Sequence, residues 1–292
     1  MKKIFGLIFF TILFLLSGCS KEETTEPYDF SNQNFENRSY IISVPDNYDP
    51  ANPSPLLFAF HGYSINGKDT QELTDFDELS KSQRYIVVYP NSLEDKGYWT
   101  DGCGCHGLEE KGVDDVKFVD YLLDKIKKQY SIDTTRIYAM GISQGAAFVQ
   151  YLACRRAEKF AAFSSYIGSM RELAARYCTP KKPVNMVIMN GTDDQDAFWE
   201  GSQNGSFAFL SIPDLFKKWA GFDGCTDSVS SEMLPDKVTH IDVEKIKYVE
   251  CSSNKELILY KILRGVHTLY RNEEFDFSVE TINFFNSHSL NN

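Results

Sequence analysis

The pentapeptide Gly141-Ile142-Ser143-Gln144-Gly145 joins two segments of opposite character and decides the fold. Residues 136–140 before it are typical of a short strand, and residues 145–157 after it have helical spacing. A G-x-S-x-G motif in this context predicts a sharp turn that holds an exposed serine above a sheet. Glycine is needed at positions 141 and 145 because a side chain there would collide with neighbouring backbone. Ser143 is therefore the candidate nucleophile, next to a helix N-terminus that favours developing negative charge.

Strands and helices alternate on either side of this motif. Short apolar runs predict strands over residues 40–44, 55–60, 85–89, 136–140, 160–167, 184–189 and 257–263. Helical spacing predicts helices over residues 69–83, 113–130, 145–157, 212–220 and 275–288. This alternation predicts the α/β class, with a mostly parallel sheet covered by helices on both faces. With no internal repeat or second domain in the pattern, we expect one domain over residues 38–292.

The composition excludes several classes of protein. Of the 292 residues, 42% are hydrophobic and 14% aromatic, which is too many for a largely disordered chain. There are 41 acidic and 30 basic side chains, for a formal net charge of −11. Because no basic cluster is present to meet phosphate groups, we expect no nucleic-acid partner.

The N-terminus has the pattern of an export signal. Lys2 and Lys3 precede residues 4–16, which are apolar except for Gly6 and Thr11. This run is too short to cross a bilayer core of about 30 Å, but it suits the apolar region of a signal peptide.

The end of that segment, Leu16-Ser17-Gly18-Cys19, resembles the lipobox of bacterial lipoproteins. The resemblance implies a signal peptide over residues 1–18, a lipidated Cys19, and a flexible tether over residues 19–37. The implied location is the outer membrane or surface of a Gram-negative bacterium, with membrane contact only through the lipid on Cys19. The alternative is an ordinary signal peptide followed by an unrelated cysteine.

Export also changes how the other cysteines are interpreted. Six remain besides Cys19, an even number in an oxidising compartment, so we expect disulfides whose pairing is not fixed by counting. The stretch Cys103-Gly104-Cys105-His106 suggests a metal site, but no second cysteine-histidine cluster completes four ligands. We therefore predict no metal site.

A serine nucleophile needs a base and a carboxylate that orients the base. In this fold the order along the chain is serine, acid, histidine, with each partner on a loop after a later strand. Asp193, Asp194 and Asp196 all follow the predicted strand 184–189, and each is a candidate acid. His267 follows strand 257–263 and is the candidate base, whereas the other four histidines are less well placed.

These residues resemble the secreted α/β-hydrolase esterases of the polyhydroxybutyrate depolymerase, feruloyl esterase and acetylxylan esterase type (carbohydrate esterase family 1 and its relatives). The resemblance covers about residues 38–288. Besides the serine turn, it rests on His61-Gly62, Trp99 before the Cys103/Cys105 loop, Gly112-Val113-Asp114-Asp115-Val116 and Leu152-Ala153-Cys154.

Two loops match the family with substitutions. The family's acid loop reads His-Gly-Thr-x-Asp followed by Tyr-x-Gly, against Asn190-Gly191-Thr192-Asp193-Asp194 and Trp199-Glu200-Gly201 here. This frame selects Asp194 as the acid. The histidine loop reads Gly-Gly-His-Thr-Trp in the family and Gly265-Val266-His267-Thr268-Leu269 here. The resemblance also implies a Cys225–Cys251 disulfide and suggests a Cys154–Cys178 disulfide.

The remaining site residues follow from this mechanism and resemblance. An oxyanion would be met by the backbone N–H groups of Gln144 and Tyr63. We expect His61, Trp99 and Trp199 to contact substrate. The aromatic side chains near these loops are candidates for a platform that holds a sugar ring or an aromatic acyl group: Tyr98, Trp99, Phe198, Trp199 and Phe207. The alternative is that these aromatic side chains only pack beneath loops.

The sequence thus predicts an exported serine carboxylic ester hydrolase that works through an acyl-enzyme without metal or organic cofactor. Feruloyl or acetyl esters of plant polysaccharide fragments are the expected, carbohydrate-linked substrates. One alternative is a depolymerase of short polyhydroxybutyrate oligomers. Others are a serine peptidase of the same fold and an inactive glycan-binding surface lipoprotein. The sequence predicts no particular oligomeric state.

Overall fold

The computed structural model describes residues 35–79, 81–93, 97–203, 205–235, 241–273 and 275–291. The predicted signal peptide 1–18, Cys19, the tether 19–37 as far as residue 34, and His240 lie outside the described residues. Among the residues that are described, no helix combines the length and apolar character needed to cross a membrane.

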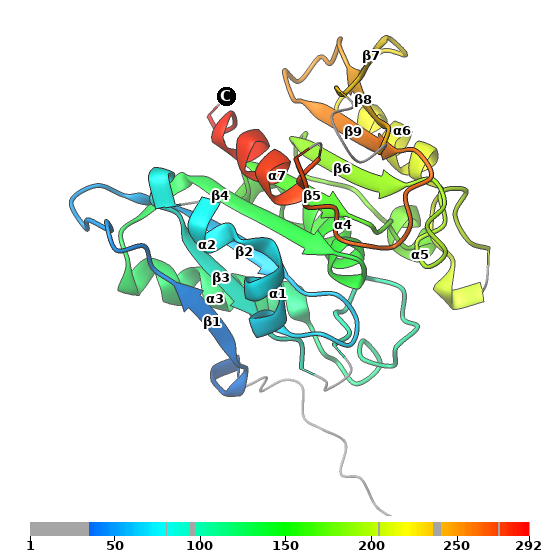
Figure 1. The fold of residues 1–292 in the computed structure, drawn as a ribbon. Coiled ribbons are helices and arrows are strands. Elements are labelled where there is room, and N and C mark those ends of the chain that lie inside the picture. Colours follow the sequence, from blue (N-terminus) through cyan, green and yellow to red (C-terminus); the bar gives the residue numbers. More distant parts are fainter. Residues whose placement is uncertain are drawn as a thin grey trace, which may run out of the picture.

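A mixed nine-stranded sheet runs through the described part of the chain, in the order β1-β3-β2-β4-β5-β6-β9-β8-β7 (Figure 1). The strands are β1 (Tyr40–Ser43), β2 (Ser54–Phe60), β3 (Ile86–Pro90), β4 (Ile132–Ile142), β5 (Ala162–Tyr166), β6 (Met186–Gly191), β7 (Val229–Met233), β8 (Val243–Tyr248) and β9 (Leu257–Ile262). From β3 to β9 every neighbouring pair in this order is parallel, while β1, β8 and β7 add antiparallel edges. The expected mostly parallel sheet is confirmed, and the β8–β7 extension is new.

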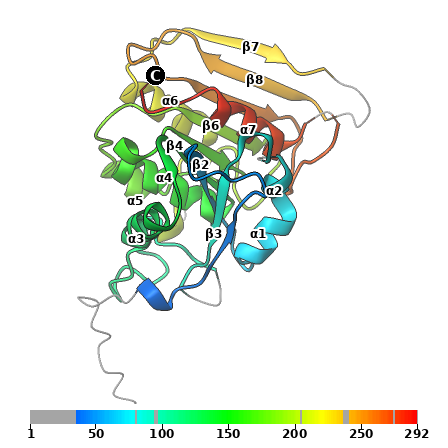
Figure 2. The same cartoon turned by 90° about the vertical axis from the view of Figure 1, so that its left-hand side faces the viewer.

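Helices cover both faces of the sheet (Figure 2). One face carries α1 (Gly67–Thr74), α2 (Phe76–Leu79) and α7 (Phe277–Asn286); the other carries α3 (Asp115–Gln129), α4 (Gln144–Arg156), α5 (Glu172–Arg176) and α6 (Ile212–Phe222). Single 3-10 turns lie at Phe35–Asn37, Lys81–Gln83, Ala157–Lys159 and Gly205–Phe207. The α/β class with helices on both faces is therefore confirmed.

The single helix predicted over residues 69–83 is wrong in length. Asn66 caps α1 by accepting hydrogen bonds from the N–H groups of Lys68 and Asp69, and the helix stops after Thr74. Asp75 takes a left-handed conformation with φ 51°, which a short polar side chain tolerates. The guanidinium of Arg271 also donates to the carbonyl of Leu73, so the helix end is held by a partner far along the chain.

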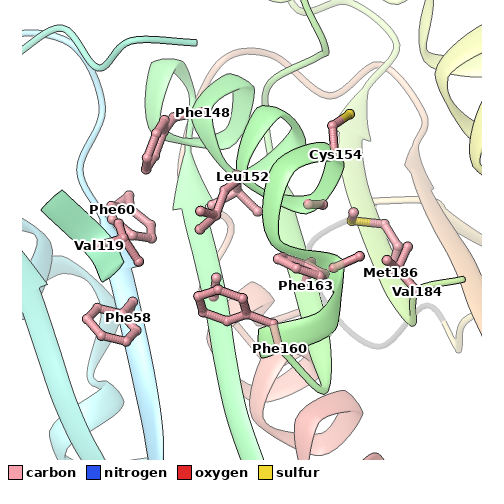
Figure 3. Close-up of a cluster of buried hydrophobic side chains, with 14 of the residues drawn as sticks. Phe58, Phe60, Val119, Phe148, Leu152, Cys154, Phe160, Phe163, Val184 and Met186 are labelled. Atoms are coloured by element: carbon pink, nitrogen blue, oxygen red, sulfur yellow. The ribbon is translucent and has the colours of Figure 1, made fainter. Parts of the chain in front are cut away.

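Strand β2 shows how the two faces of the sheet acquire their cores. Leu56, Phe58 and Phe60 belong to the apolar cluster beneath α3 and α4, whereas Leu57 and Ala59 belong to the cluster beneath α7. All five are fully buried, as expected for alternate side chains of a central strand. Figure 3 shows the first of these clusters, in which Phe58, Phe60, Phe148 and Leu152 lie between the sheet and α4.

This packing fixes the carboxyl end of the sheet. In the register of the parallel pair β2·β4, Phe60 lies opposite Gly141, so the loops that follow these strands begin side by side. Three disulfides join Cys103 to Cys105, Cys154 to Cys178 and Cys225 to Cys251. The last two are the pairings that the family resemblance suggests. The first leaves neither Cys103 nor Cys105 with a thiolate to offer a metal.

Candidate active site

The turn at Ser143 is built as the glycine pattern predicts. A Cβ added at Gly141 would lie 2.1 Å from the carbonyl oxygen of Gly145, and one at Gly145 would lie 2.5 Å from that of Phe60. Ser143 itself has φ 55° and ψ −114°, an unfavourable conformation for a residue with a side chain. Such strain persists only where the surroundings enforce it. Here the backbone N–H of Ser143 donates to the carbonyl of Tyr166 on β5, which helps to hold the turn.

Ser143, His267 and Asp194 meet at this edge of the sheet. The Oγ of Ser143 lies 3.0 Å from Nε2 of His267, and Nδ1 of His267 lies 2.8 Å from Oδ2 of Asp194. Of the three candidate aspartates, only Asp194 is buried; Asp193 and Asp196 are exposed. The structure thus joins the three predicted side chains in one hydrogen-bonded chain.

The environment of Asp194 favours its ionised form. Burial acts to raise the pKa of this carboxyl, but hydrogen bonds from His267 and from the N–H groups of Ala197 and Asp196 hold the pKa below its usual value. Because an ionised carboxylate only accepts hydrogen bonds, the proton of a neutral His267 sits on Nδ1. Nε2 is then left to accept the hydroxyl proton of Ser143, which is the arrangement that a general base needs.

The acid and histidine loops are fastened to one another. The N–H of Asp193 donates to the carbonyl of Gly265 at 2.9 Å, and the N–H of Arg264 donates to the hydroxyl of Thr192 at 2.7 Å. A Cβ at Gly191 would lie 2.2 Å from the carbonyl oxygen of Gly265, so the two loops are in close contact. Asp194 and His267 are therefore placed by loops that are joined independently of the serine turn.

Tyr166 supports the histidine loop from beneath, a role that sequence reasoning missed. Its hydroxyl donates to the carbonyl of Thr268 at 2.8 Å and accepts from the N–H of Tyr270 at 2.7 Å. Burial raises the pKa of Tyr166, so the phenol stays protonated and can donate. Its place at the end of a predicted strand gave no indication of this contact.

Gln144 and Tyr63 both line the cleft beside Ser143. Gln144 is the first residue of α4, and N–H groups of the first helical turn have no acceptor within the helix. Its side chain is buried, accepting from the N–H of Trp99 and donating to the carbonyl of Trp99, both at 2.9 Å. This two-point contact fixes the start of α4, where the oxyanion donor is expected.

The cleft in front of Ser143 has a volume of about 570 Å³ and one aromatic side. We call Tyr63, Tyr98, His106 and Phe207 the aromatic wall. Ring centroids are 4.7 Å apart for Tyr63 and Tyr98 and 3.9 Å for Tyr98 and His106, both stacked, and 5.6 Å for His106 and Phe207, edge to face. The wall confirms that Tyr98 and Phe207 face the cleft, while Tyr63 and His106 join them.

His61 and Trp99 do not contact the cleft, so their predicted contact with substrate is wrong. They are 1% and 0% exposed, because both support the loop after β2 from within. The indole N–H of Trp99 donates to the carbonyl of His61 at 3.0 Å, and Nε2 of His61 accepts from the N–H of Ser92 at 3.0 Å. Burial lowers the pKa of His61, in keeping with a neutral structural imidazole.

Trp199 is not among the residues that line this cleft, and its contact with substrate stays a prediction. It is partly buried against the core, and the ammonium of Lys261 lies 5.7 Å from its ring centroid. For Trp99, which is fully buried, the alternative of packing beneath loops is the better description.

A buried ion pair in the cleft was not predicted. The carboxylate of Asp101 is fully buried, and its Oδ2 accepts from Nε of Arg171 at 2.7 Å and from Nε2 of Gln144 at 3.3 Å. Arg171 lines the cleft with its side chain 14% exposed. Neither residue belongs to a motif, and only the folded chain brings them together across 70 residues.

Among the described residues, two groups of side chains have the residue types of a metal site. Asp101, Cys103, Cys105 and His106 form one, but the two sulfur atoms are bonded to each other. Asp194, Asp196 and His267 form the other, but Nδ1 of His267 already donates to Asp194. The sulfur atoms of the first group are therefore committed to a disulfide, and the imidazole of the second is committed to hydrogen bonds with Asp194 and Ser143.

The chain resembles several known esterases in sequence. A bifunctional acetylxylan esterase/xylanase of Neocallimastix patriciarum is 30% identical over 166 residues, covering 57% of this chain and 23% of that protein. Feruloyl esterase B of Piromyces equi is 24% identical over 65% of this chain and 36% of its own length. Feruloyl esterase D of Neurospora crassa is 29% identical over 61% of each. The chain thus spans less than two thirds of the length of these curated relatives.

Solved structures agree on the fold. The acetyl xylan esterase from Aspergillus awamori superposes with a TM-score of 0.63 at 17% identity, covering 86% of this chain and 94% of that one. A Bacillus cereus carboxylesterase gives 0.53 at 17% identity, over 90% and 99%. These matches identify the architecture as the α/β-hydrolase fold. A family model described as "Putative esterase" matches residues 31–218, more than half of the chain, and the chain therefore belongs to that esterase family.

Proposed function

We propose that this protein is a serine carboxylic ester hydrolase that works through an acyl-enzyme. The observation that carries the proposal is the hydrogen-bonded chain from Ser143 through His267 to the buried carboxylate of Asp194, open to a cleft at the serine end. Membership of the esterase family supports the same reaction class.

In the first step the Ser143 oxygen attacks the ester carbonyl while His267 Nε2 takes the hydroxyl proton. The carbonyl oxygen gains negative charge, which the N–H groups of Gln144 and Tyr63 stabilise; losing one such donor typically costs about 3–4 kcal/mol of transition-state stabilisation. The C–O bond to the alcohol then breaks, and His267 returns its proton to the leaving alkoxide. Asp194 stabilises the imidazolium throughout.

In the second step water attacks the acyl-enzyme carbonyl as His267 Nε2 accepts one of its protons. Collapse of the intermediate breaks the bond to Ser143, and the same proton passes to the serine oxygen. The products are a carboxylic acid and the regenerated enzyme. No metal or organic cofactor is needed, since proton transfer and charge stabilisation are all supplied by the chain.

We further propose feruloyl or acetyl esters of plant polysaccharide fragments as substrates. The names of the relatives, acetylxylan esterase and feruloyl esterase, support this class. The aromatic wall supports an acyl group with a flat ring, because rings stack favourably in offset or edge-to-face geometry.

The test uses the purified chain from residue 35 onward with 4-nitrophenyl acetate and butyrate, and a fluorophosphonate probe. We expect hydrolysis of the nitrophenyl esters and covalent labelling at Ser143, with both lost in Ser143→Ala. The acyl class is assigned by comparing the rates of hydrolysis of acetylated xylan, methyl ferulate and hydroxybutyrate oligomers. If the folded protein shows neither turnover nor labelling but still binds glycan, the glycan-binding alternative is the correct one.

We also propose that the protein is an exported lipoprotein anchored through Cys19. The signal-like residues 1–18 and the disulfides support passage into an oxidising compartment. Expression in a Gram-negative host with a labelled fatty acid should mark the wild-type chain but not Cys19→Ala. Equal labelling, or a wild-type chain that keeps residues 1–18, would contradict the anchor.

A further inference from the structure

The guanidinium of Arg171 is oriented by two hydrogen bonds, to Asp101 and to the backbone of Phe207. Nε donates to the buried carboxylate of Asp101, which is itself held by the N–H of Cys103 at 3.2 Å and by the amide of Gln144. Nη1 donates to the carbonyl of Phe207 at 3.2 Å. The orientation of the planar group is thus set before any ligand arrives.

One edge of that guanidinium remains available to the cleft. Nη2 makes no hydrogen bond to any residue within the described ranges, and the side chain is only partly exposed where it lines the cleft. Because Asp101 balances the charge of Arg171, the pair is close to neutral as a unit. It suits a neutral oxygen acceptor better than a free anion.

The ion pair is continuous with the aromatic wall. His106 stacks on Tyr98, and its Nε2 lies 3.9 Å from Oδ2 of Asp101. The ring of Phe207 packs edge to face on His106, and its backbone carbonyl accepts a hydrogen bond from Nη1 of Arg171. A flat group lying against the wall therefore ends beside a fixed hydrogen-bond donor.

We propose that Arg171 is a specificity-determining residue, which donates from Nη2 to a phenolic or methoxy oxygen on an aromatic acyl group that stacks on the aromatic wall. The inference rests on the proposed ester hydrolase function and deepens it. A flat aromatic acyl group fits better than a sugar here, because two other polar groups of the cleft are already bonded. The hydroxyl of Ser169 donates to the carbonyl of Leu210 at 2.7 Å, and the side-chain amide of Gln144 is bonded to the backbone of Trp99. Asp101 is the positioning residue for Arg171.

The experiment compares methyl ferulate with methyl cinnamate, which has the same skeleton without the ring oxygens. For the wild type we expect kcat/KM to be about ten- to a hundredfold higher on the ferulate, the typical value of one charge-assisted hydrogen bond. In Arg171→Met the ratio should fall to about one. Arg171→Lys should give an intermediate ratio, because lysine keeps the charge but loses the planar fork.

Two further variants guard against misfolding and unspecific effects. Arg171→Met leaves the buried Asp101 without its cation, so Arg171→Met/Asp101→Asn removes both charges and should show the same low ratio. Arg176→Met removes an exposed guanidinium from the neighbouring helix α5, outside the cleft, and should keep the wild-type ratio. Thermal melts establish which variants are folded.

Binding to Ser143→Ala, measured by calorimetry, separates recognition from turnover and should favour the ferulate in the same way. An unchanged ferulate-to-cinnamate ratio in the folded Arg171 variants would overturn the inference while leaving the hydrolase intact. A loss confined to acetylated xylo-oligosaccharides would also overturn it, by assigning Arg171 to the alcohol part. If no ester is hydrolysed, the proposed function is contradicted. The inference on Arg171 is then tested by binding alone, and equal affinity of Ser143→Ala for methyl ferulate and methyl cinnamate would reject it.

Discussion

The Nδ1 atom of His267 lies 2.8 Å from Oδ2 of Asp194, across loops that follow two adjacent parallel strands, β6 and β9. The carboxylate also accepts two backbone N–H groups, so its orientation does not depend on the imidazole. An oriented, ionised acceptor is what fixes the tautomer of the histidine, and this relationship can be tested directly.

Asp194→Asn should lower kcat on 4-nitrophenyl acetate by about 10³–10⁴-fold, since an amide can present a donor to Nδ1 and favour the wrong tautomer. The fold should be unaffected because the side chain keeps its size. Asp193→Asn, at the exposed neighbouring position, is the matched control and should retain nearly full activity. Equal losses in the two variants would argue against Asp194 as the acid.

Asp223→Asn should stabilise the protein at alkaline pH. Burial raises the pKa of Asp223 to about 7, and its Oδ2 makes no hydrogen bond among the described residues. When a carboxyl has a higher pKa in the folded than in the unfolded protein, its protonated form stabilises the fold. This contribution to the free energy of unfolding is fully present below the unfolded pKa of about 4 and is lost as pH rises through the folded pKa of about 7. Asparagine can still accept from the N–H of Val184. Melting temperatures at pH 8 should therefore rise relative to wild type, with a much smaller difference at pH 5.

The control for that experiment is Asp227→Asn, a nearby exposed position. It should leave the melting temperature nearly unchanged at both pH values. A uniform rise for Asp223→Asn at pH 5 and pH 8 would mean that the gain does not come from titration.

The contact between Glu256 and His288 should make stability fall in acid. The hydrogen bond from His288, together with that from Lys247, holds the pKa of Glu256 at about 2 despite opposing burial. A depressed folded pKa means that the stabilisation is present above about pH 4.5 and is lost as pH falls through about 2. Because the Glu256 side chain is 25% exposed and its charge is partly screened by solvent, we expect a loss of roughly 1–2 kcal/mol.

Urea denaturation at pH 7 and pH 3 measures that loss. Glu256→Gln should be less stable than wild type at pH 7 and should lose less on acidification. Parallel pH profiles for the two proteins would show that other carboxyl groups dominate.

The Cys103–Cys105 disulfide should stabilise the protein less than the Cys154–Cys178 disulfide. By loop-closure entropy, Cys103–Cys105 encloses so short a loop that it contributes about 1.6 kcal/mol, against about 3.5 kcal/mol for Cys154–Cys178 with its separation of 24 residues. Replacing each pair by serine and measuring unfolding free energies should give this order. The Cys103/Cys105 variant should instead raise KM for methyl ferulate, because its loop carries His106 into the aromatic wall. A larger stability loss for that pair would contradict the entropic argument.

The sequence predicted those helices and strands in which apolar residues form a continuous run or recur at regular spacing. Strand β2 is buried along its whole length and was found; β7 is exposed at every position and β8 half-buried, so neither gave an apolar run. The end of α1 was missed because it depends on Asp75 and on Arg271, almost 200 residues away.

For the site, chain order and strand context were enough to select Ser143 and His267. Choosing among three neighbouring aspartates needed the family frame, because burial of Asp194 is a tertiary property. The same limit explains the error at His61 and Trp99, where residue type suggests a ligand contact but packing makes both structural. Arg171 belongs to no motif, and only the fold brings it to Asp101.

The bonds that join the Asp193 and Arg264 loops have a spectroscopic consequence. Because backbone hydrogen bonds join the two loops that carry Asp194 and His267, these side chains are held together without help from Ser143. The strongly deshielded Nδ1 proton between them should remain visible by NMR after Ser143 is removed. Removing the serine hydroxyl would then abolish ester hydrolysis but leave the His267–Asp194 hydrogen bond intact.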